Sequence, residues 1–187
     1  MTAIRRMIVA IGALAAAIAV TAALAGASVA GGATRATATI VNADGVEVGW
    51  VKLVEDGSRI VHVNVHVKGL TPGLHGIHIH SIGLCSPSFA AAGGHYNPLT
   101  RMHGLANPGG AHAGDLPNLI VNEDGVGHLD ATTDRVTLTD GPTTLFDTTA
   151  NAAGSAFIVH ANEDDQLTDA TNGGSGARIA CGVIVAG

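Results

Sequence analysis

Apolar and polar residues alternate along most of the chain after residue 30, and turn signals recur roughly every eight to twelve positions. In RIVHVNVHV (59–67), valine takes every second position from Val61 onward. Such runs end in Asp-Gly or Pro-Gly sequences, which favour turns. No segment after residue 30 shows the period of a long helix. The pattern therefore predicts an all-β protein, an antiparallel sandwich or barrel.

Two long segments interrupt the expected strands. Strands are predicted at residues 36–41, 46–54, 59–67, 119–121, 126–133, 143–147, 156–160 and 178–187. Residues 83–117 are rich in Gly, Pro and His, and residues 161–177 are acidic. Loops longer than about 12 to 15 residues in a compact domain are usually functional or disordered. Because histidines lie in or beside both loops, we expect both to be functional.

The first 30 residues have a different character. Arg5 and Arg6 precede an uncharged, alanine-rich run from Met7 to Ala30 that finishes in small residues. This is typical of a secretory signal peptide cleaved after Ala30, which leaves residues 31–187 as one domain. An uncleaved anchor is the alternative, because the run exceeds the ~20 residues that span a bilayer. The arginine pair also permits a twin-arginine signal, although the flanking residues give it little support.

Charge excludes one class of partner. The chain has 9 Lys and Arg against 15 Asp and Glu, and cleavage after Ala30 would change the net charge from −6 to −8. Nucleic acid is therefore a poor partner, because its binding needs a basic surface. With the signal removed, no membrane contact is expected either. Only 3% of residues are aromatic, so the core should consist mostly of Val, Ile, Leu and Ala.

The chain has two cysteines, Cys85 and Cys181. In an exported chain such a pair predicts a disulfide, whereas in a cytosolic chain it could equally be two free thiols. Closing a loop of this length is worth ~4.7 kcal/mol in the chain-entropy model, before native strain is subtracted. We predict the disulfide.

A first histidine cluster lies in GLHGIHIH (73–80). In a strand, His78 and His80 would lie on one face about 6.6 Å apart, and could converge on one metal ion. His75 lies beside turn glycines and is expected to pack or hydrogen-bond rather than to bind metal. His160 ends a predicted strand and, taken alone, fits a structural role. His62, His66 and His128 lie in strand patterns without nearby partners and are also expected to be structural.

A second cluster lies in GGHYNPLTRMHGLANPGGAHAGDLPN (93–118). It contains His95, His103, His112 and Asp115. Three imidazoles and a carboxylate make a complete tetrahedral ligand set for zinc, which would fix an otherwise loose loop. The alternative is a disordered loop, because Gly- and His-rich stretches can lack structure.

Five segments together resemble the copper/zinc superoxide dismutase family, in its exported bacterial form. They are GLHGIHIH (73–80), GGHYNP (93–98), HAGDLPN (112–118), VHANEDD (159–165) and GARIACGVIV (176–185). The resemblance covers nearly all of residues 31–187. It implies an eight-stranded antiparallel Greek-key β-barrel or sandwich with two long functional loops. It also implies an enzyme that converts superoxide to dioxygen and hydrogen peroxide by alternating reduction and oxidation of copper, beside a structural zinc.

The resemblance assigns a role to each site residue. Copper is implied at His78, His80, His95 and His160, and zinc at His95, His103, His112 and Asp115. The shared His95 is expected to act in catalysis by moving a proton, and Arg178 by holding the anionic substrate. Asp164 is implied to link copper and zinc histidines. Cys85 and Cys181 match the family's disulfide.

The chain departs from the family in its acidic loop. Residues 161–177 contain Glu163, Asp164, Asp165 and Asp169 but no Lys or Arg. We therefore expect weak electrostatic steering, dependent on Arg178 and Arg101. The N-terminal signal predicts a secreted, cell-envelope or periplasmic protein, and a homodimer is possible.

Two other functions compete with the enzyme. A copper store or delivery protein would bind copper without turnover, but delivery usually uses soft Cys or Met ligands, which are scarce here. A purely structural β-domain would make all the histidines incidental, so that losing His160 would change nothing.

Overall fold

Ten β-strands and two short 3-10 helices make up the described part of the computed structural model, residues 34–146 and 154–187. The strands are β1 (Arg35–Asn42), β2 (Glu47–Glu55), β3 (Val61–Lys68), β4 (Gly73–His75), β5 (Ile77–His80), β6 (Leu119–Val121), β7 (Val126–Thr133), β8 (Ala156–His160), β9 (Arg178–Val183) and β10 (Val185–Ala186). The helices are η1 (Phe89–Ala92) and η2 (Asp169–Gly174). The predicted signal peptide, residues 1–30, lies outside the described residues. Neither helix is long and apolar enough to cross a membrane.

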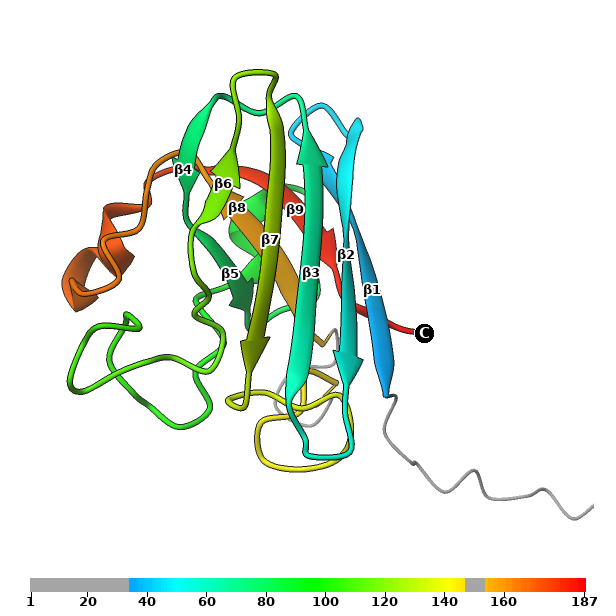
Figure 1. Ribbon diagram of the computed structural model, residues 1–187, viewed down its shortest axis with the longest axis vertical. Helices are drawn as coiled ribbons and strands as arrows, with labels where there is room; N and C mark the ends of the chain where they lie inside the picture. Colours follow the sequence, from blue (N-terminus) through cyan, green and yellow to red (C-terminus); the bar gives the residue numbers. More distant parts are fainter. Residues whose placement is uncertain (1–33, 147–153) are drawn as a thin grey trace, which may run out of the picture.

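The strands form one antiparallel, barrel-like sheet (Figure 1). Its order is β4-β6-β7-β3-β2-β1-β9-β8-β5, and β10 adds to β1. The two ends of this order, β4 and β5, are separated in sequence only by Gly76. Strands distant in sequence are neighbours, as β3 is to β7 and β5 is to β8, which is the arrangement of a Greek key. The predicted all-β antiparallel barrel is confirmed.

The strand count differs from the implied eight for local reasons. GLHGIHIH is divided at Gly76, where the chain leaves β6 as its partner and pairs with β8 instead. Residues 178–187 are divided at Ile184, which packs inward between β9 and β10. The strand predicted at 143–147 was wrong for its described residues. Thr144 makes only an isolated bridge, within tight turns that bury Leu145.

The alternation of apolar and polar residues along each strand determines which side chains form the core, and β3 shows this most plainly. Its four valines are at most 1% exposed, and its polar residues face outward. Aliphatic residues from the other strands complete the cluster, with Phe157 as its largest fully buried side chain. Since each buried aliphatic side chain contributes roughly 1.5–3 kcal/mol, this low-aromatic core can hold the barrel together.

Two long loops project from the same side of the barrel, drawn in green and orange in Figure 1. They are residues 81–118, between β5 and β6, and residues 161–177, between β8 and β9. The amide of Ala106 donates to the carbonyl of Gln166 at 2.8 Å. Asn118 and Asp164 exchange two hydrogen bonds, at 2.8 and 2.9 Å. The two loops therefore support each other.

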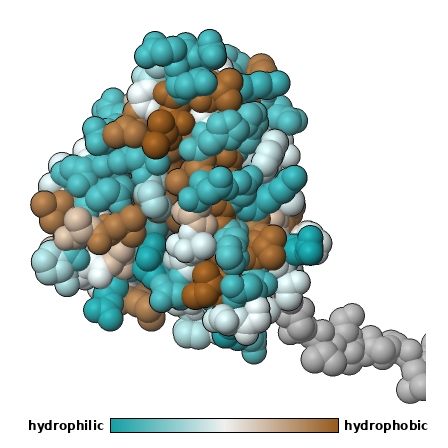
Figure 2. All heavy atoms as spheres, in the orientation of Figure 1, coloured by the Kyte–Doolittle hydropathy of each residue, from teal (hydrophilic) through white to brown (hydrophobic). Residues whose placement is uncertain are grey.

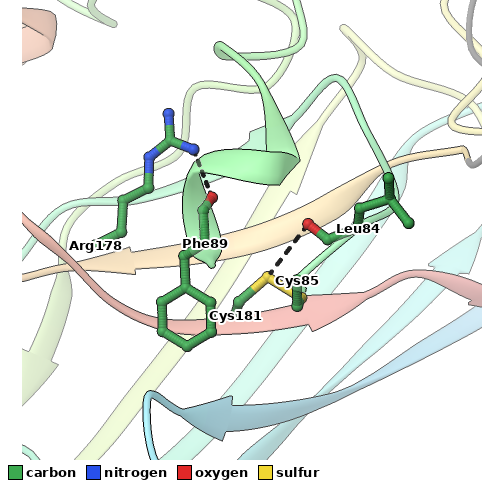
Figure 3. The surroundings of a disulfide bond; sticks show 5 residues. All are labelled: Leu84, Cys85, Phe89, Arg178 and Cys181. Carbon is green, nitrogen blue, oxygen red and sulfur yellow. Dashed lines mark hydrogen bonds between the residues drawn. A yellow bond between two sulfur atoms is a disulfide. The ribbon is translucent and has the colours of Figure 1, made fainter. Parts of the chain in front are cut away.

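A disulfide joins the first loop to the barrel (Figure 3). It links Cys85 to Cys181 of β9, which are 96 positions apart in sequence, with their Cα atoms 5.8 Å apart. Cys181 is fully buried, against Ala156 and Ile158 of β8. The predicted pairing is confirmed, and it fixes the loop beside the end of β8.

A buried carboxylate at the end of β2 gives a prediction about stability. Glu55, whose side chain is 2% exposed, accepts hydrogen bonds from the amides of Leu138 and Thr139 at 2.6 and 2.7 Å. Burial alone would raise the pKa of Glu55, but hydrogen bonds from Thr139 and Leu138 hold it below its usual range. The ionised form therefore stabilises the fold above about pH 4.3, the ordinary glutamate pKa, and this contribution is lost as pH falls through the lower folded pKa.

Glu55→Gln is expected to lower the free energy of unfolding at pH 7 by about 1–3 kcal/mol. The two amides share Oε2, while Oε1 accepts from the Thr139 hydroxyl at 2.7 Å; an amide has a single acceptor oxygen and no charge to strengthen these bonds. Urea unfolding at pH 7 and pH 4 measures the change, which should shrink at the lower pH. Glu47→Gln, on the exposed start of the same strand, is the matched control. Equal losses in the two variants would contradict the prediction.

Candidate metal centre

Strand β5 supplies the first two histidines of the site. His78 and His80 face away from Ile77 and Ile79, which are fully buried in the core. Their ring centroids are 6.3 Å apart. Antiparallel pairing with β8 brings in His160, whose ring centroid is 4.9 Å from that of His78. Its backbone amide donates to the carbonyl of Gly76 at 2.8 Å, which fixes the end of β8.

His95 joins this group from the first long loop. It forms an isolated bridge with His80, and its ring centroid lies 4.0 Å from that of His78. The centre therefore contains two sets of converging donors. One set is His78, His80, His95 and His160, and the other includes His78, His95, His103 and Asp115, with the donor atoms of each set within 4.8 Å of one another. His78 and His95 belong to both, but His78 Nε2 is bonded to Asp164, so His78 has only Nδ1 free.

Backbone and carboxylate acceptors fix how the first three histidines are oriented. His80 Nδ1 donates to the carbonyl of Gly93 at 2.9 Å, and His160 Nδ1 donates to that of Gly176 at 3.1 Å. His78 Nε2 donates to Asp164 Oδ2 at 2.6 Å. The opposite nitrogens, His78 Nδ1, His80 Nε2 and His160 Nε2, are buried without a hydrogen-bond partner among the described residues. Three lone pairs aimed into one buried space fit a metal ion, since buried polar atoms otherwise find partners.

These three imidazoles are held neutral, as metal ligands must be. Burial lowers the pKa of His78 to about 3, although the hydrogen bond that His78 donates to Asp164 acts in the opposite direction and raises it. Burial also lowers the pKa of His80 to about 2 and that of His160 to about 4. At neutral pH no proton competes for the three free nitrogens.

Four residues grouped around the Asp115 carboxylate, His95, His103, His112 and Asp115 itself, have the dimensions of a zinc site. Asp115 Oδ1 lies 3.0 Å from His95 Nδ1, 3.1 Å from His103 Nδ1 and 3.4 Å from His112 Nδ1. The Nδ1 atoms of His95 and His112 are 3.3 Å apart. A tetrahedron with metal–ligand distances of 2.0–2.1 Å has edges of about 3.3 Å. The four residues therefore fit zinc.

Hydrogen bonds direct the Asp115 carboxylate. Its Oδ2 accepts from the amides of Gly104 and His112 at 2.8 and 2.9 Å, which leaves Oδ1 toward the imidazoles. Burial alone would raise the pKa of Asp115, but hydrogen bonds from His103, His112 and His95 hold it far below its usual range. Burial likewise opposes a charge on His103, whose hydrogen bonds to Asp115 and Asp164 nevertheless raise its pKa to about 9. We expect metal to displace this proton on binding.

Asp164 connects the two sets. Its Oδ2 accepts from His78 Nε2 at 2.6 Å and its Oδ1 from His103 Nε2 at 3.0 Å. The carboxylate is fully buried, and these hydrogen bonds from His103 and His78 lower its pKa well below its usual range although burial alone would raise it. A carboxylate that orients one histidine in each set ties their positions together.

Arg178 lies beside the first set. It is the strand partner of His160. Its Nη1 donates to the carbonyl of Phe89 at 2.6 Å (Figure 3), and its Nη2 donates to that of Gly93 at 2.6 Å. Gly93 is also the acceptor of His80, so one carbonyl positions both the guanidinium and a candidate ligand. Burial lowers the pKa of Arg178, but the group stays cationic because a guanidinium is not deprotonated in proteins.

Several supporting residues could not be found from sequence. The carbonyls of Gly93 and Gly176 orient rings through backbone atoms, which leave no side-chain signal. His75, by contrast, was expected from the sequence to pack or hydrogen-bond, and this is confirmed: it bonds the carbonyls of His160 and Thr71 at 2.7 and 2.9 Å and so holds the end of β8. Gly173 has φ of 67°, and a Cβ there would overlap Asp164 Oδ1. For Gly173, the only sequence signal was the presence of glycines in the acidic loop, residues 161–177.

Comparisons with known proteins agree with this geometry. Residues 47–184 match the family described as copper/zinc superoxide dismutase (SODC). Superoxide dismutase (Cu-Zn) 2 of Aquifex aeolicus is 38% identical over 153 residues, covering 80% of this chain and 86% of the relative. Superoxide dismutase (Cu-Zn) of Caulobacter vibrioides is 42% identical, covering 80% and 84%. The crystal structure of a SOD-like protein from Bacillus subtilis superposes with a TM-score of 0.73 at 38% identity, covering 80% and 97%.

Proposed function

Because this chain belongs to the copper/zinc superoxide dismutase family, we propose that it converts superoxide to dioxygen and hydrogen peroxide outside the cytoplasm. The observation that carries the proposal is the position of His95. Its ring, like that of His78, belongs to both sets of converging donors, but one nitrogen of His78 is already bonded to Asp164. An imidazole has two nitrogens, so one ring can serve two metal ions. A store for a single metal has no need of that arrangement.

We assign copper to His78, His80, His95 and His160, and zinc to His95, His103, His112 and Asp115. Copper supplies a one-electron redox couple when bound, whereas zinc has no redox chemistry and adds fixed positive charge. Three free nitrogens support the first assignment and the tetrahedral spacing supports the second. Asp164 keeps His78 and His103 in their orientations.

Two residues act on substrate and proton. The Arg178 guanidinium, fixed by two carbonyls, attracts and orients the superoxide anion beside His80 and His160. His95 directs Nδ1 toward Asp115, so its Nε2 is the atom that takes up a proton and releases it to the product. Product formation needs protons, and a buried site must supply them from its own side chains.

A metal-loading series tests the proposed function. The chain is prepared metal-free, with zinc alone, with copper alone and with both, and superoxide dismutation is measured for each. We expect activity only with copper, and full activity with both metals. Stoichiometric copper binding without turnover would favour a copper store instead.

Electrostatic steering is expected to be weak, because residues 161–177 carry four acidic side chains and no Lys or Arg. Arg178 lies beside the candidate copper ligands, as the strand partner of His160, and Arg101 is a second cation, on the first long loop. We predict that the second-order rate constant changes less than about twofold between 10 and 150 mM salt, whereas strongly steered enzymes change steeply. Stopped-flow measurements across that range test it. A several-fold decrease with salt would contradict the prediction.

Export and assembly complete the proposal. The disulfide and the bacterial relatives are consistent with a location outside the cytoplasm. We propose that residues 1–30 direct secretion and are removed, leaving residues 31–187 as the mature enzyme. The homodimer stays a prediction.

A further inference from the structure

A second pair of histidines lies on the solvent face of the sheet. His66 of β3 and His128 of β7 are strand partners. Their Nδ1 atoms face each other at 3.3 Å, and their ring centroids are 4.6 Å apart. His66 is half-buried and His128 is exposed, on the side opposite the buried valines of β3. This face, turned toward the viewer in Figure 2, is mostly hydrophilic.

The distance between His66 Nδ1 and His128 Nδ1 matches the distance between two donor atoms that bind the same metal ion. It equals the 3.3 Å between the Nδ1 atoms of His95 and His112, which fit a zinc tetrahedron. It is longer than the roughly 2.7–3.2 Å of an ordinary hydrogen bond from a nitrogen donor. We propose that His66 and His128 form a surface site for a divalent transition metal ion, copper(II) in first preference.

The donor type determines the class of metal. Imidazole nitrogen suits copper, zinc and nickel, and among divalent ions copper binds such donors most tightly. Asp130, two residues along β7, hydrogen-bonds Asn64, and Lys52 lies over Trp50 on the next strand. Because Asp130 and Lys52 have opposite charges, their effects on a bound cation offset each other. Metal binding therefore depends on the two imidazoles. Water can complete the coordination at an exposed position.

The chain contains a built-in reporter for this site. Trp50 is the strand partner of His66 on β2, and its ring stacks on His66 with centroids 5.7 Å apart. It is the only tryptophan in the sequence. A paramagnetic copper(II) ion held by His66 would therefore quench its fluorescence, whereas diamagnetic zinc would not quench by this route.

Copper(II) titration of the chain already loaded with copper and zinc tests the proposal. We expect quenching of Trp50 that saturates at one added equivalent. His128→Asn, which leaves Trp50 and His66 in place, should weaken the apparent affinity at least tenfold, because two linked donors bind far more tightly than one. His62→Asn is the matched control, since His62 lies on the same face of β3 and pairs with Asp56 at 3.0 Å. It should leave the titration unchanged.

Electron paramagnetic resonance of the added copper gives an independent measurement on the unaltered chain. We expect a second copper signal with coupling to two equivalent nitrogens, which becomes one nitrogen in His128→Asn. A titration identical in His128→Asn and the unaltered chain, or no added signal with nitrogen coupling, would overturn the proposal. Either result leaves the proposed dismutase function unaffected, because neither His66 nor His128 belongs to the buried centre.

Discussion

Replacing His160 with alanine is expected to lower superoxide dismutation more than a hundredfold while the barrel stays folded. The side chain supplies Nε2, one of the three buried histidine nitrogens without a hydrogen-bond partner among the described residues. The fold does not depend on the ring, because the backbone amide of His160 bonds Gly76 and its carbonyl accepts from His75. The loss should therefore be in copper binding and turnover.

Activity, copper content and circular dichroism of the variant separate these effects. His62→Ala is the control, because it removes an exposed strand histidine that bonds Asp56 and belongs to neither donor set. The control should retain full activity and copper content. Normal activity in His160→Ala would exclude His160 as a copper ligand and favour a structural role for it.

The substitution Gly173→Ala is expected to weaken zinc binding by about 10- to 100-fold. This is the usual effect of losing a group that orients metal ligands. The added Cβ would overlap Asp164 Oδ1 and lie 2.9 Å from His103 Nε2. Asp164 would then have to move, and its hydrogen bonds to His78 and His103 would break. Dismutation should fall as well, because His78 loses the acceptor that fixes its orientation.

Gly174→Ala provides a matched control for this variant. Gly174 has φ of 71°, close to the 67° of Gly173, but a Cβ there meets nothing within 4 Å. Both alanines pay a similar backbone strain of roughly 1–2 kcal/mol. Competition with a chromogenic zinc chelator measures the difference in zinc affinity. Equal affinities in the two variants would show that backbone strain, and not displacement of Asp164, controls the site.

Much of the barrel could be predicted from alternation, because strands with one buried face impose a period of two. β3 and β7 lie where their sequences place them. The segment 143–147 looked equally strand-like, but Leu145 is buried by turns and not by a ladder. The sequence also could not predict that one strand ends and the next begins at Gly76, because a change of strand partner depends on distant residues.

In the site too, some residues could be predicted from the nearby sequence, whereas others depend on contacts between distant parts of the chain. His78 and His80 could be paired from their spacing alone, since the period of a strand determines it. His160 carried no local signal and was assigned only through the resemblance of VHANEDD (159–165) to the family. The pairing of His66 with His128 needs the register of β3 against β7, strands more than fifty residues apart. Neither spacing nor motif could supply that register.

The central claim is that His95 is shared by a copper and a zinc site. Anomalous diffraction at the copper and zinc edges, from crystals of the metal-loaded chain, tests this most directly. The account predicts a copper peak among His78, His80 and His160, a zinc peak among His103, His112 and Asp115, and His95 in contact with both. Metal at only one of these positions, or two peaks that do not share His95, would contradict it.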